Sequence, residues 1–329
     1  MSFDSKSGKL SCGACGRQDN IDQFSEEHIY ATFDENEAKE YHCNNCGADI
    51  ITDAHTAATT CRFCGAGVVL ADRVTGTLAP SLVIPFAISK AEAEAAFKKW
   101  CRNGLITPRG FMTADRIKSI TGIYVPFWMY DLTSRVKVNA SGTRVRTYSR
   151  GDYIYTETRH YHIYRDIRLN YLKVPVDASE KMNDELMDKL EPYPYHELKK
   201  FKTPYLAGYI AEKYNYDDEQ LLPRAKEKIS RFIDEYVSST VRGYTTVTYH
   251  GKDVDTRKAK SYYVLLPVWM VNYHYKNKEY LFAMNGHTGK VVGKPPISRG
   301  KVAGWFGGVA GGTLLVFRLV TMFMGGGLI

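Results

Sequence analysis

The chain has 329 residues, of which 44% are hydrophobic and 13% aromatic, and its formal net charge is +8. This length allows two or three domains, and the hydrophobic content is that of a globular protein and excludes a wholly disordered chain. Residues 1–80 contain six Lys and Arg against twelve Asp and Glu, so they carry −6 and the remainder carries +14. An acidic region is a poor clamp for phosphates, which argues against nucleic-acid binding at the N-terminal end.

Six of the seven cysteines form Cys-x-x-Cys pairs, and a glycine follows each pair at once: Cys12/Cys15, Cys43/Cys46 and Cys61/Cys64. A Cys-x-x-Cys-Gly turn directs two thiolates toward one point. The second and third pairs are separated by 14 residues, a spacing typical of a four-thiolate zinc ribbon with a hairpin between the pairs. Four thiolates close a tetrahedral shell, so we predict a structural Zn²⁺ at Cys43, Cys46, Cys61 and Cys64.

The first pair, Cys12/Cys15, lacks an obvious partner pair in the sequence. It resembles the second half of a ribbon whose first knuckle would precede Met1. Zinc shared between two chains, or a site completed by His28 or His42, would also satisfy these two thiolates. The sequence therefore predicts one complete zinc site and one half site.

The sequence changes character near residues 75–80, and we expect an α+β fold in three parts. These are a zinc-ribbon module over 1–75, a central domain over 76–300 and a transmembrane anchor over 301–329. Amphipathic periodicity and N-cap residues predict helices near 89–102, 179–190 and 217–238. Alternating segments rich in Tyr, Ile and Thr predict a mainly antiparallel sheet.

Two pairs of similar segments predict an internal duplication of a strand–helix–strand unit. A strand ended by proline and followed by a serine N-cap occurs twice, at Pro85/Ser89 and at Pro175/Ser179. Pro-x-Trp-Met occurs within an apolar run in both IYVPFWMYDL (Ile123–Leu132) and VLLPVWMVNY (Val264–Tyr273).

The stretch from Arg144 to Arg168 interleaves Arg and His with Tyr. Such a pattern suits a stacking surface for single-stranded nucleic acid. A strand pair with Tyr packed on one face and Arg outside gives the same pattern, and we favour this structural interpretation. Catalytic motifs are lacking: GHTGK at 286–290 is too short for a phosphate loop, and there is no Gly-x-Ser-x-Gly or His-Glu-x-x-His. We expect no enzymatic activity.

The C-terminal segment 302–329 is apolar and contains one charged residue, Arg318. It is long enough to cross a bilayer. Lys294, Arg299 and Lys301 precede it, which predicts a single-pass membrane protein with a cytoplasmic N-terminus. Small residues that recur every four positions form a smooth face for helix packing and predict a homo-oligomer or a helical partner in the membrane: Gly304, Gly307, Gly308, Gly311 and Gly312. Arg318 returns to nearly the same face and would pair with an acidic residue or extend toward the interface.

Taken together, these motifs resemble a bacterial family of TFIIB-type zinc-ribbon membrane proteins. The resemblance covers nearly the whole chain and rests on the CxxCG pairs and on TAATTCRFCG, VIPFAISKAEAEAAFKKW, YVPFWMYD, VPVDASEKMNDELMDKLEPY, YLAGYIAEKY and FAMNGHTGKVVG. Members typically have a complete first ribbon, from which this chain departs. Such proteins are often labelled helicase-like, although this sequence has no motor motifs.

The resemblance implies a non-catalytic, membrane-anchored adaptor that recruits protein partners. Its implied partners are flotillin-like (SPFH-domain) scaffolds and phage-shock-type, PspA-like membrane-stress proteins. The alternative is a membrane-tethered protein that binds single-stranded nucleic acid through the segment from Arg144 to Arg168.

Overall fold

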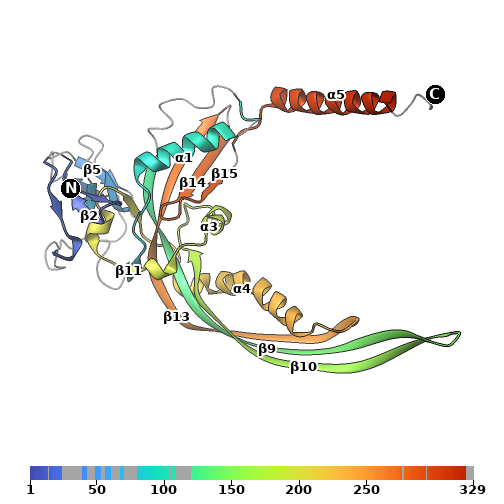
Figure 1. Cartoon of the computed structure of the whole chain (residues 1–329). Coiled ribbons are helices and arrows are strands. Elements are labelled where there is room, and N and C mark those ends of the chain that lie inside the picture. Colours follow the sequence, from blue (N-terminus) through green and yellow to red (C-terminus); the bar gives the residue numbers. More distant parts are fainter. Residues whose placement is uncertain are drawn as a thin grey trace.

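The structure, a computed structural model, combines a sheet-rich body with a long β arm and a C-terminal apolar helix (Figure 1). It describes residues 1–13, 15–23, 39–42, 49–52, 56–60, 67–69, 80–103, 106–108, 120–275, 278–293 and 295–323. The small N-terminal strands lie at one end of the molecule, and the arm and the C-terminal helix extend from the body toward the other end.

A ten-stranded sheet forms the body and the arm. Its central strands, β9 (Thr121–Arg150) and β13 (Thr246–Tyr275), pair antiparallel along most of their length. The other strands of the sheet are β6 (Thr56–Thr60), β7 (Gly67–Val69), β8 (Leu82–Val83), β10 (Tyr153–Asp177), β11 (Lys199–Lys200), β12 (Ile210–Glu212), β14 (Lys278–Asn285) and β15 (Val291–Gly293). Among these strands, only the β8–β13 and β9–β12 pairings are parallel. The sheet is therefore mainly antiparallel, as the sequence predicted.

Helices cover the sheet at the positions where the sequence is amphipathic: α1 (Lys90–Asn103), α3 (Asp184–Leu190) and α4 (Asp218–Thr240). Phe97 of α1 packs on Phe282 with ring centroids 4.9 Å apart. One apolar face of α4 is buried against β9 and β10. Short 3-10 turns connect the remaining elements: η1 (Ile21–Gln23), η4 (Tyr195–Glu197) and η5 (Thr203–Leu206).

The two Pro-x-Trp-Met segments lie side by side at the centre of the sheet. Val125 of β9 stands opposite Leu266 of β13, and the pairing is symmetric about this point. Pro126 therefore faces Leu265, and Pro267 faces Tyr124. This register has the local twofold symmetry that an internal duplication would leave.

Hydrogen bonds repeat around the same centre. The carbonyl of Pro126 accepts from Ala178 N at 2.9 Å, and that of Pro267 accepts from Gly286 N at 2.8 Å. The indole nitrogen of Trp128 donates to the carbonyl of Tyr216 at 2.9 Å. The indole nitrogen of Trp269 donates to the carbonyl of Ile88 at 3.0 Å. Each accepting carbonyl belongs to the residue directly before a helix N-cap, so each tryptophan ties its strand to the start of a helix.

These contacts define two equivalent halves. The first half is β8, α1, β9 and β10, and the second half is β12, α4, β13 and β14. Each half begins with a short strand that pairs parallel with the long strand of the other half: Ile210 on Ile123, and Leu82 on Val264. The two halves are therefore interlocked in a single sheet.

The internal duplication was predicted to relate α1 to the helix that follows Ser179, and this prediction is wrong. Ser179 is not an N-cap, because α3 begins five residues later and Asn183 caps it. The Ser179 hydroxyl instead donates to the buried carboxylate of Glu212 at 2.8 Å. The counterpart of α1 is α4, since both helices start with a capping box after an equivalent strand.

The arm consists of the distal parts of β9 and β10, with the first part of β13 alongside. Strand β13 joins the arm where Thr246 pairs with Thr143, and α4 covers one face up to Thr240. Beyond Thr143 only β9 and β10 continue, to a turn at Gly151 and Asp152. The tip of the arm is therefore a two-stranded ribbon.

Candidate functional site

The three Cys-x-x-Cys-Gly segments occupy equivalent connections between paired strands. Antiparallel pairs form between β2 (Lys9–Ser11) and β3 (Gln18–Asp19), between β4 (Lys39–His42) and β5 (Asp49–Thr52), and between β6 and β7. The last pairs before the connections are Ser11 with Gln18, His42 with Asp49 and Thr60 with Gly67. All three connections thus have the same length and place two cysteines and a glycine at the same positions.

The first of these hairpins shows the turn geometry. Cys12 N donates to Arg17 O at 2.9 Å, and Gly16 N donates to Cys12 O at 2.9 Å. Gly16 has φ of +72°, a conformation that glycine adopts without strain. Cys15 is exposed and Cys12 is half-buried. The hairpin therefore presents its cysteine pair at the surface of the module.

The predicted zinc ligands Cys43, Cys46, Cys61 and Cys64 lie outside the described residues. Across the described ranges, no group of three or more His, Cys, Asp or Glu gathers as a metal site would require. Thiolates are the donors that structural zinc prefers, and matched hairpins suit a four-thiolate shell. Strand β5 pairs with β4 and β6 with β7, so the hairpins enclose the Cys pairs, whereas the sequence suggested a hairpin between them. Zinc binding stays a prediction.

The first and third cysteine hairpins are attached to the body. Phe3 N donates to Ala207 O at 2.8 Å, and the Phe3 ring packs edge-on against Tyr205. Strand β1 (Ser2–Asp4) pairs with β2, and β6 pairs with β12 where Ala58 faces Ala211. The residues predicted as a separate module over 1–75 thus supply edge strands to the central sheet.

The C-terminal helix α5 (Arg299–Phe323) is exposed along its length, and its 24-residue apolar stretch Arg299–Met322 is long enough to cross a membrane. Its start is held by hydrogen bonds from Ser298 N to Ile106 O at 2.7 Å and from Lys301 Nζ to Thr107 O at 2.6 Å. A Cβ added at any of Gly304, Gly307, Gly308, Gly311 and Gly312 would meet nothing within 4 Å. The glycine face and Arg318 are therefore open to a neighbouring helix.

The segment from Arg144 to Arg168 forms most of the distal arm. Arg and Tyr do not separate onto opposite faces, as one interpretation of the sequence required. The Arg146 guanidinium lies over the Tyr148 ring at 5.8 Å, and Tyr148 stacks on Tyr155 with centroids 5.6 Å apart. Arg144 lies between Tyr161 and Tyr244. Basic and aromatic side chains thus share one face of the ribbon.

A partly buried charge network, which the sequence did not reveal, joins the end of β10 to α3 and α4. Arg224 contacts Asp184 at 2.7 Å and Asp188 at 3.2 Å. Lys228 contacts Asp188 at 2.9 Å and Glu191 at 2.6 Å. Burial, assisted by the neighbouring Asp184, raises the pKa of Asp177 to about 7. These groups are widely spaced in the sequence, and the network fixes α3 against α4.

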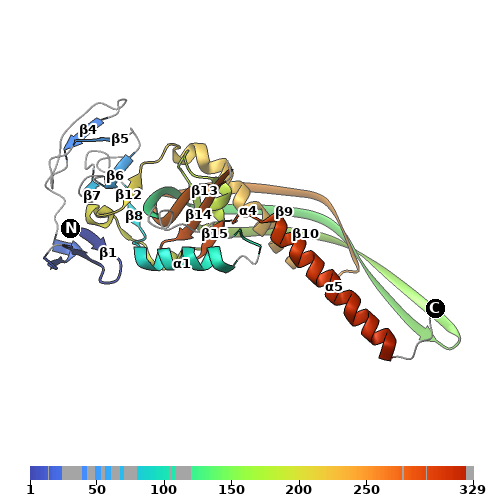
Figure 2. The same cartoon turned by 90° about the horizontal axis from the view of Figure 1, so that it is seen from above.

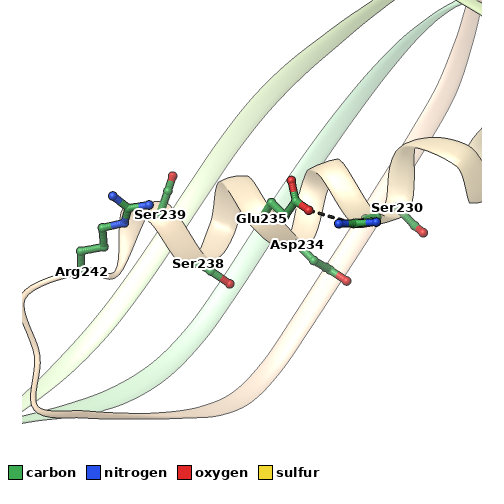
Figure 3. A pocket seen from close by; sticks show the side chains of 7 residues that line it. Ser230, Asp234, Glu235, Ser238, Ser239 and Arg242 are labelled. Atoms are coloured by element: carbon green, nitrogen blue, oxygen red, sulfur yellow. Dashed lines mark hydrogen bonds and ion pairs between the residues drawn. The ribbon is translucent and has the colours of Figure 1, made fainter. Parts of the chain in front are cut away.

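A surface depression lies along the exposed side of α4 and its C-terminal turn (Figure 3). It is lined by Ser230, Arg231, Asp234, Glu235, Ser238, Ser239 and Arg242. Arg231 and Glu235 form an ion pair at 2.9 Å within the helix. All seven residues come from one helix and the turn after it, so this solvated surface has no built binding site.

No protein-family model and no solved structure matches the chain. The chain is 66% identical over 327 residues to a Bacillus subtilis (strain 168) protein that carries the name uncharacterized protein YdjG. The match covers 99% of this chain and 96% of that protein. Similarity of this extent includes the cysteine hairpins, both halves of the sheet and the apolar helix. The chain therefore belongs to the same protein family as Bacillus subtilis YdjG.

Proposed function

We propose that the protein is a non-catalytic, membrane-anchored adaptor. The observation that carries this proposal is the separation of two features at opposite ends of the molecule (Figure 1). An exposed apolar helix long enough to span a bilayer leaves the body at one end. Cysteine hairpins of matched length lie at the other end, where the β6–β7 hairpin joins the sheet through β12. A membrane anchor and a distant docking module are the two parts that an adaptor needs.

The docking module binds one Zn²⁺ through Cys43, Cys46, Cys61 and Cys64. Four thiolates leave no open coordination position, so the metal acts structurally and shapes the hairpins for protein binding. The pair Cys12/Cys15 provides two further thiolates on a hairpin of the same length. Chelation would therefore loosen the N-terminal end and release the partner, because structural zinc supplies folding free energy.

The anchor α5 places the body on the cytoplasmic side of the cell membrane. Basic residues flank its N-terminal end, and positively charged flanks stay in the cytoplasm. A reducing compartment also keeps the thiolates available for zinc. The open glycine face suits a second copy or another membrane helix. By resemblance, the protein partners are flotillin-like scaffolds and PspA-like stress proteins.

The test is a pull-down of the full-length protein from detergent-solubilised membranes, followed by mass spectrometry and zinc analysis. The double variant C43S/C46S removes two ligands, and C101S is the matched control because Cys101 lies in α1 outside every pair. We expect the double variant to lose zinc and one or more membrane partners, and C101S to keep both. An unchanged set of partners in the double variant would refute docking through the zinc module.

A second candidate function is binding of single-stranded nucleic acid on the arm. The contact between Arg146, Tyr148 and Tyr155 favours it, because bases stack on aromatic rings and phosphates pair with Arg. Tight binding of an oligonucleotide by the full-length protein, with a steep dependence on salt, would support this function and weaken the adaptor proposal.

A further inference from the structure

The arm has two free edges. Among the described strands, β10 pairs only with β9, and Figure 2 shows it on the side of the arm opposite to β13. The part of β13 before Val264 likewise has β9 as its only described neighbour. In an antiparallel pair every second residue turns its N–H and C=O toward the neighbouring strand, so the residues between them turn these groups outward. Each edge therefore offers backbone groups to a further strand.

The edge of β13 is protected against such pairing. It carries Lys252, Lys258 and Lys260, and its pairing with β9 shifts register twice within the same stretch. Lys258 is also tied to Asp218 of α4 at 2.6 Å. Lysines and bulges at an edge keep one sheet from joining another.

The edge of β10 lacks this protection. Residues 161–171 read YHIYRDIRLNY and contain neither lysine nor proline. They belong to one continuous register with β9 that runs from Tyr153 to Tyr171. The first irregularity of β10 follows at Lys173, whose φ is +58°. We name residues 161–171 the open edge.

One flank of α4 follows the open edge. At one end Lys228 Nζ donates to Pro175 O of β10 at 2.6 Å, and at the other end Arg165 Nη2 donates to Thr240 O at 3.0 Å. Residues four apart lie on one stripe of a helix. The flank therefore consists of positions 228, 232, 236 and 240, and it runs beside β10 (Figure 1).

The middle of this flank is apolar and exposed. Phe232 is 58% exposed and Tyr236 is 48% exposed, although aromatic rings are normally at least partly buried. The side chains of the open edge that turn toward α4 are apolar and only partly buried: Ile167, Leu169 and Tyr171. When a peptide adds to a sheet, backbone pairing gives affinity and contacts to alternate side chains give specificity. The open edge and the flank of α4 supply both.

The face of the open edge that turns away from α4 is basic. Arg168 stands opposite Arg135 of β9, and Asp166 stands opposite Lys137. Arg135 binds both carboxylate oxygens of Asp166, at 3.0 and 2.6 Å. Three cations against one carboxylate leave a charge of +2 on this face. Because like charges opposite each other destabilise a strand pair, a carboxylate beside Arg168 would stabilise the edge.

We propose that the open edge binds an extended segment of a partner protein in which apolar residues alternate with acidic ones. The segment adds a strand to β10, its apolar side chains cover Phe232 and Tyr236, and its carboxylates face Arg168. A second copy of this chain fits less well, because pairing β10 with β10 would bring two basic edges together. This surface is separate from the cysteine hairpins, so the protein would dock partners at two places.

The experiment measures by fluorescence anisotropy how labelled peptides bind the full-length protein in nanodiscs. The probe is a peptide in which valine alternates with glutamate. One control peptide has lysine in place of glutamate, and another groups the same residues without alternation. Two further peptides carry N-methyl groups on the valines or on the glutamates. In a strand these two sets of N–H groups point to opposite edges, so only one set can pair with β10.

We expect the valine–glutamate peptide and only one of its N-methylated forms to bind. F232A/Y236A should weaken binding about tenfold or more, because aromatic anchors carry much of the energy of an interface. Y249A removes a ring that is 46% exposed beside the protected edge, and it should not weaken binding. R168E should reverse the preference, so that the valine–lysine peptide binds more tightly than the valine–glutamate peptide.

Failure of the valine–glutamate peptide to bind, or equal binding of both N-methylated forms, would overturn the proposal. C43S/C46S should bind this peptide as the wild type does, whatever happens to docking through zinc. Loss of the peptide in C43S/C46S but not in F232A/Y236A would place it at the cysteine hairpins and refute the open edge. A dimer that F232A/Y236A separates and that no peptide binds would assign the edge to a second copy instead.

Discussion

The two halves of the sheet share their backbone contacts but differ at the residue that ends the returning strand. The first half ends β10 with Asp177, and the second half ends β14 with Asn285. Both side chains are buried, and each accepts a hydrogen bond from a backbone N–H two residues later: Ser179 N at 3.0 Å and His287 N at 2.9 Å. The turn needs a buried acceptor, which either residue supplies, whereas only the acceptor of the first half is a titratable carboxyl group.

The long strands also differ between the halves. In the first half β9 runs far beyond its Pro-x-Trp-Met segment before it turns into β10, whereas in the second half β13 turns into β14 soon after that segment. In compensation, β13 starts far ahead of its own segment and pairs with the extended β9. The arm is therefore an elaboration of one half that the other half supports. The two halves therefore share one core, and the arm is an extension that belongs to the first half.

The largest expected effect tests the tryptophan contacts that relate the halves. Trp269 is 3% exposed and Trp128 is half-buried. W269A removes a buried ring and the donor to Ile88 O, so the free energy of unfolding should fall by about 3–5 kcal/mol. W128A should cost about half as much. Thermal unfolding of the full-length protein in detergent measures both, with exposed Trp305 providing W305A as control. If W269A destabilises the protein no more than W305A does, the contact of Trp269 with Ile88 O does not support the fold and the prediction is wrong.

Sequence patterns predicted the elements whose signals are local. Helices α1 and α4 begin within one residue of the expected positions, because Ser89 and Asp217 form capping boxes that the sequence displays. The apolar composition and length of α5 were equally plain. Helix α3 starts later than expected because Ser179 binds Glu212, a partner distant in the sequence.

Relations that depend on distant partners were not predictable. The sequences of β8 and β12 share no motif, and only their backbone pairing with the two central strands shows that they are equivalent. The network around Asp177 collects groups that are far apart in the chain. The alternation in β9 and β10 indicated strands, but it could not show that β13 stops short of the tip of the arm. Zinc at Cys43, Cys46, Cys61 and Cys64 stays a prediction.

The next effect concerns the titratable carboxyl group that distinguishes the halves. Burial raises the pKa of Asp177 to about 7, so the folded protein retains a proton that the unfolded chain releases near pH 4. The free energy of unfolding contributed by this group is therefore highest below about pH 4 and falls as the pH rises to about 7. D177N installs the amide of the second half and should abolish this fall. At pH 7.5 the variant should be about 2–4 kcal/mol more stable than the wild type.

Urea unfolding of the full-length protein in detergent across pH 4–8 measures this difference. N285D is the reciprocal variant, and it should introduce a destabilisation that grows with pH, because Asn285 is buried. Parallel pH profiles for wild type and D177N would show that Asp177 titrates as an ordinary carboxylate and would contradict the prediction.

A smaller effect is expected at the residue after each strand end, which is Ala178 in the first half and Gly286 in the second. A Cβ at Gly286 would lie 2.5 Å from the Phe86 ring and 2.8 Å from Pro267 Cβ. G286A should therefore cost about 1–3 kcal/mol by overpacking. A178G loses only one methyl group and some backbone restriction, and should cost about 0.5–1 kcal/mol. Thermal unfolding measures both, and a stabilising G286A would show that Phe86 moves freely.

The smallest expected effect tests whether the two helix starts are energetically equivalent. In the first half the Ser89 hydroxyl accepts from Glu92 N at 3.4 Å, and in the second half the Asp217 carboxylate accepts from Gln220 N at 2.8 Å. S89A and D217A should each lower the free energy of unfolding by about 1 kcal/mol. D217A should cost slightly more, because Asp217 also accepts from a second backbone N–H and its negative charge favours the N-terminal end of the helix. Exposed Ser230 in α4 provides S230A as control. Adding salt should narrow the difference between S89A and D217A, since it screens the charge of Asp217 while both hydrogen-bonded caps persist.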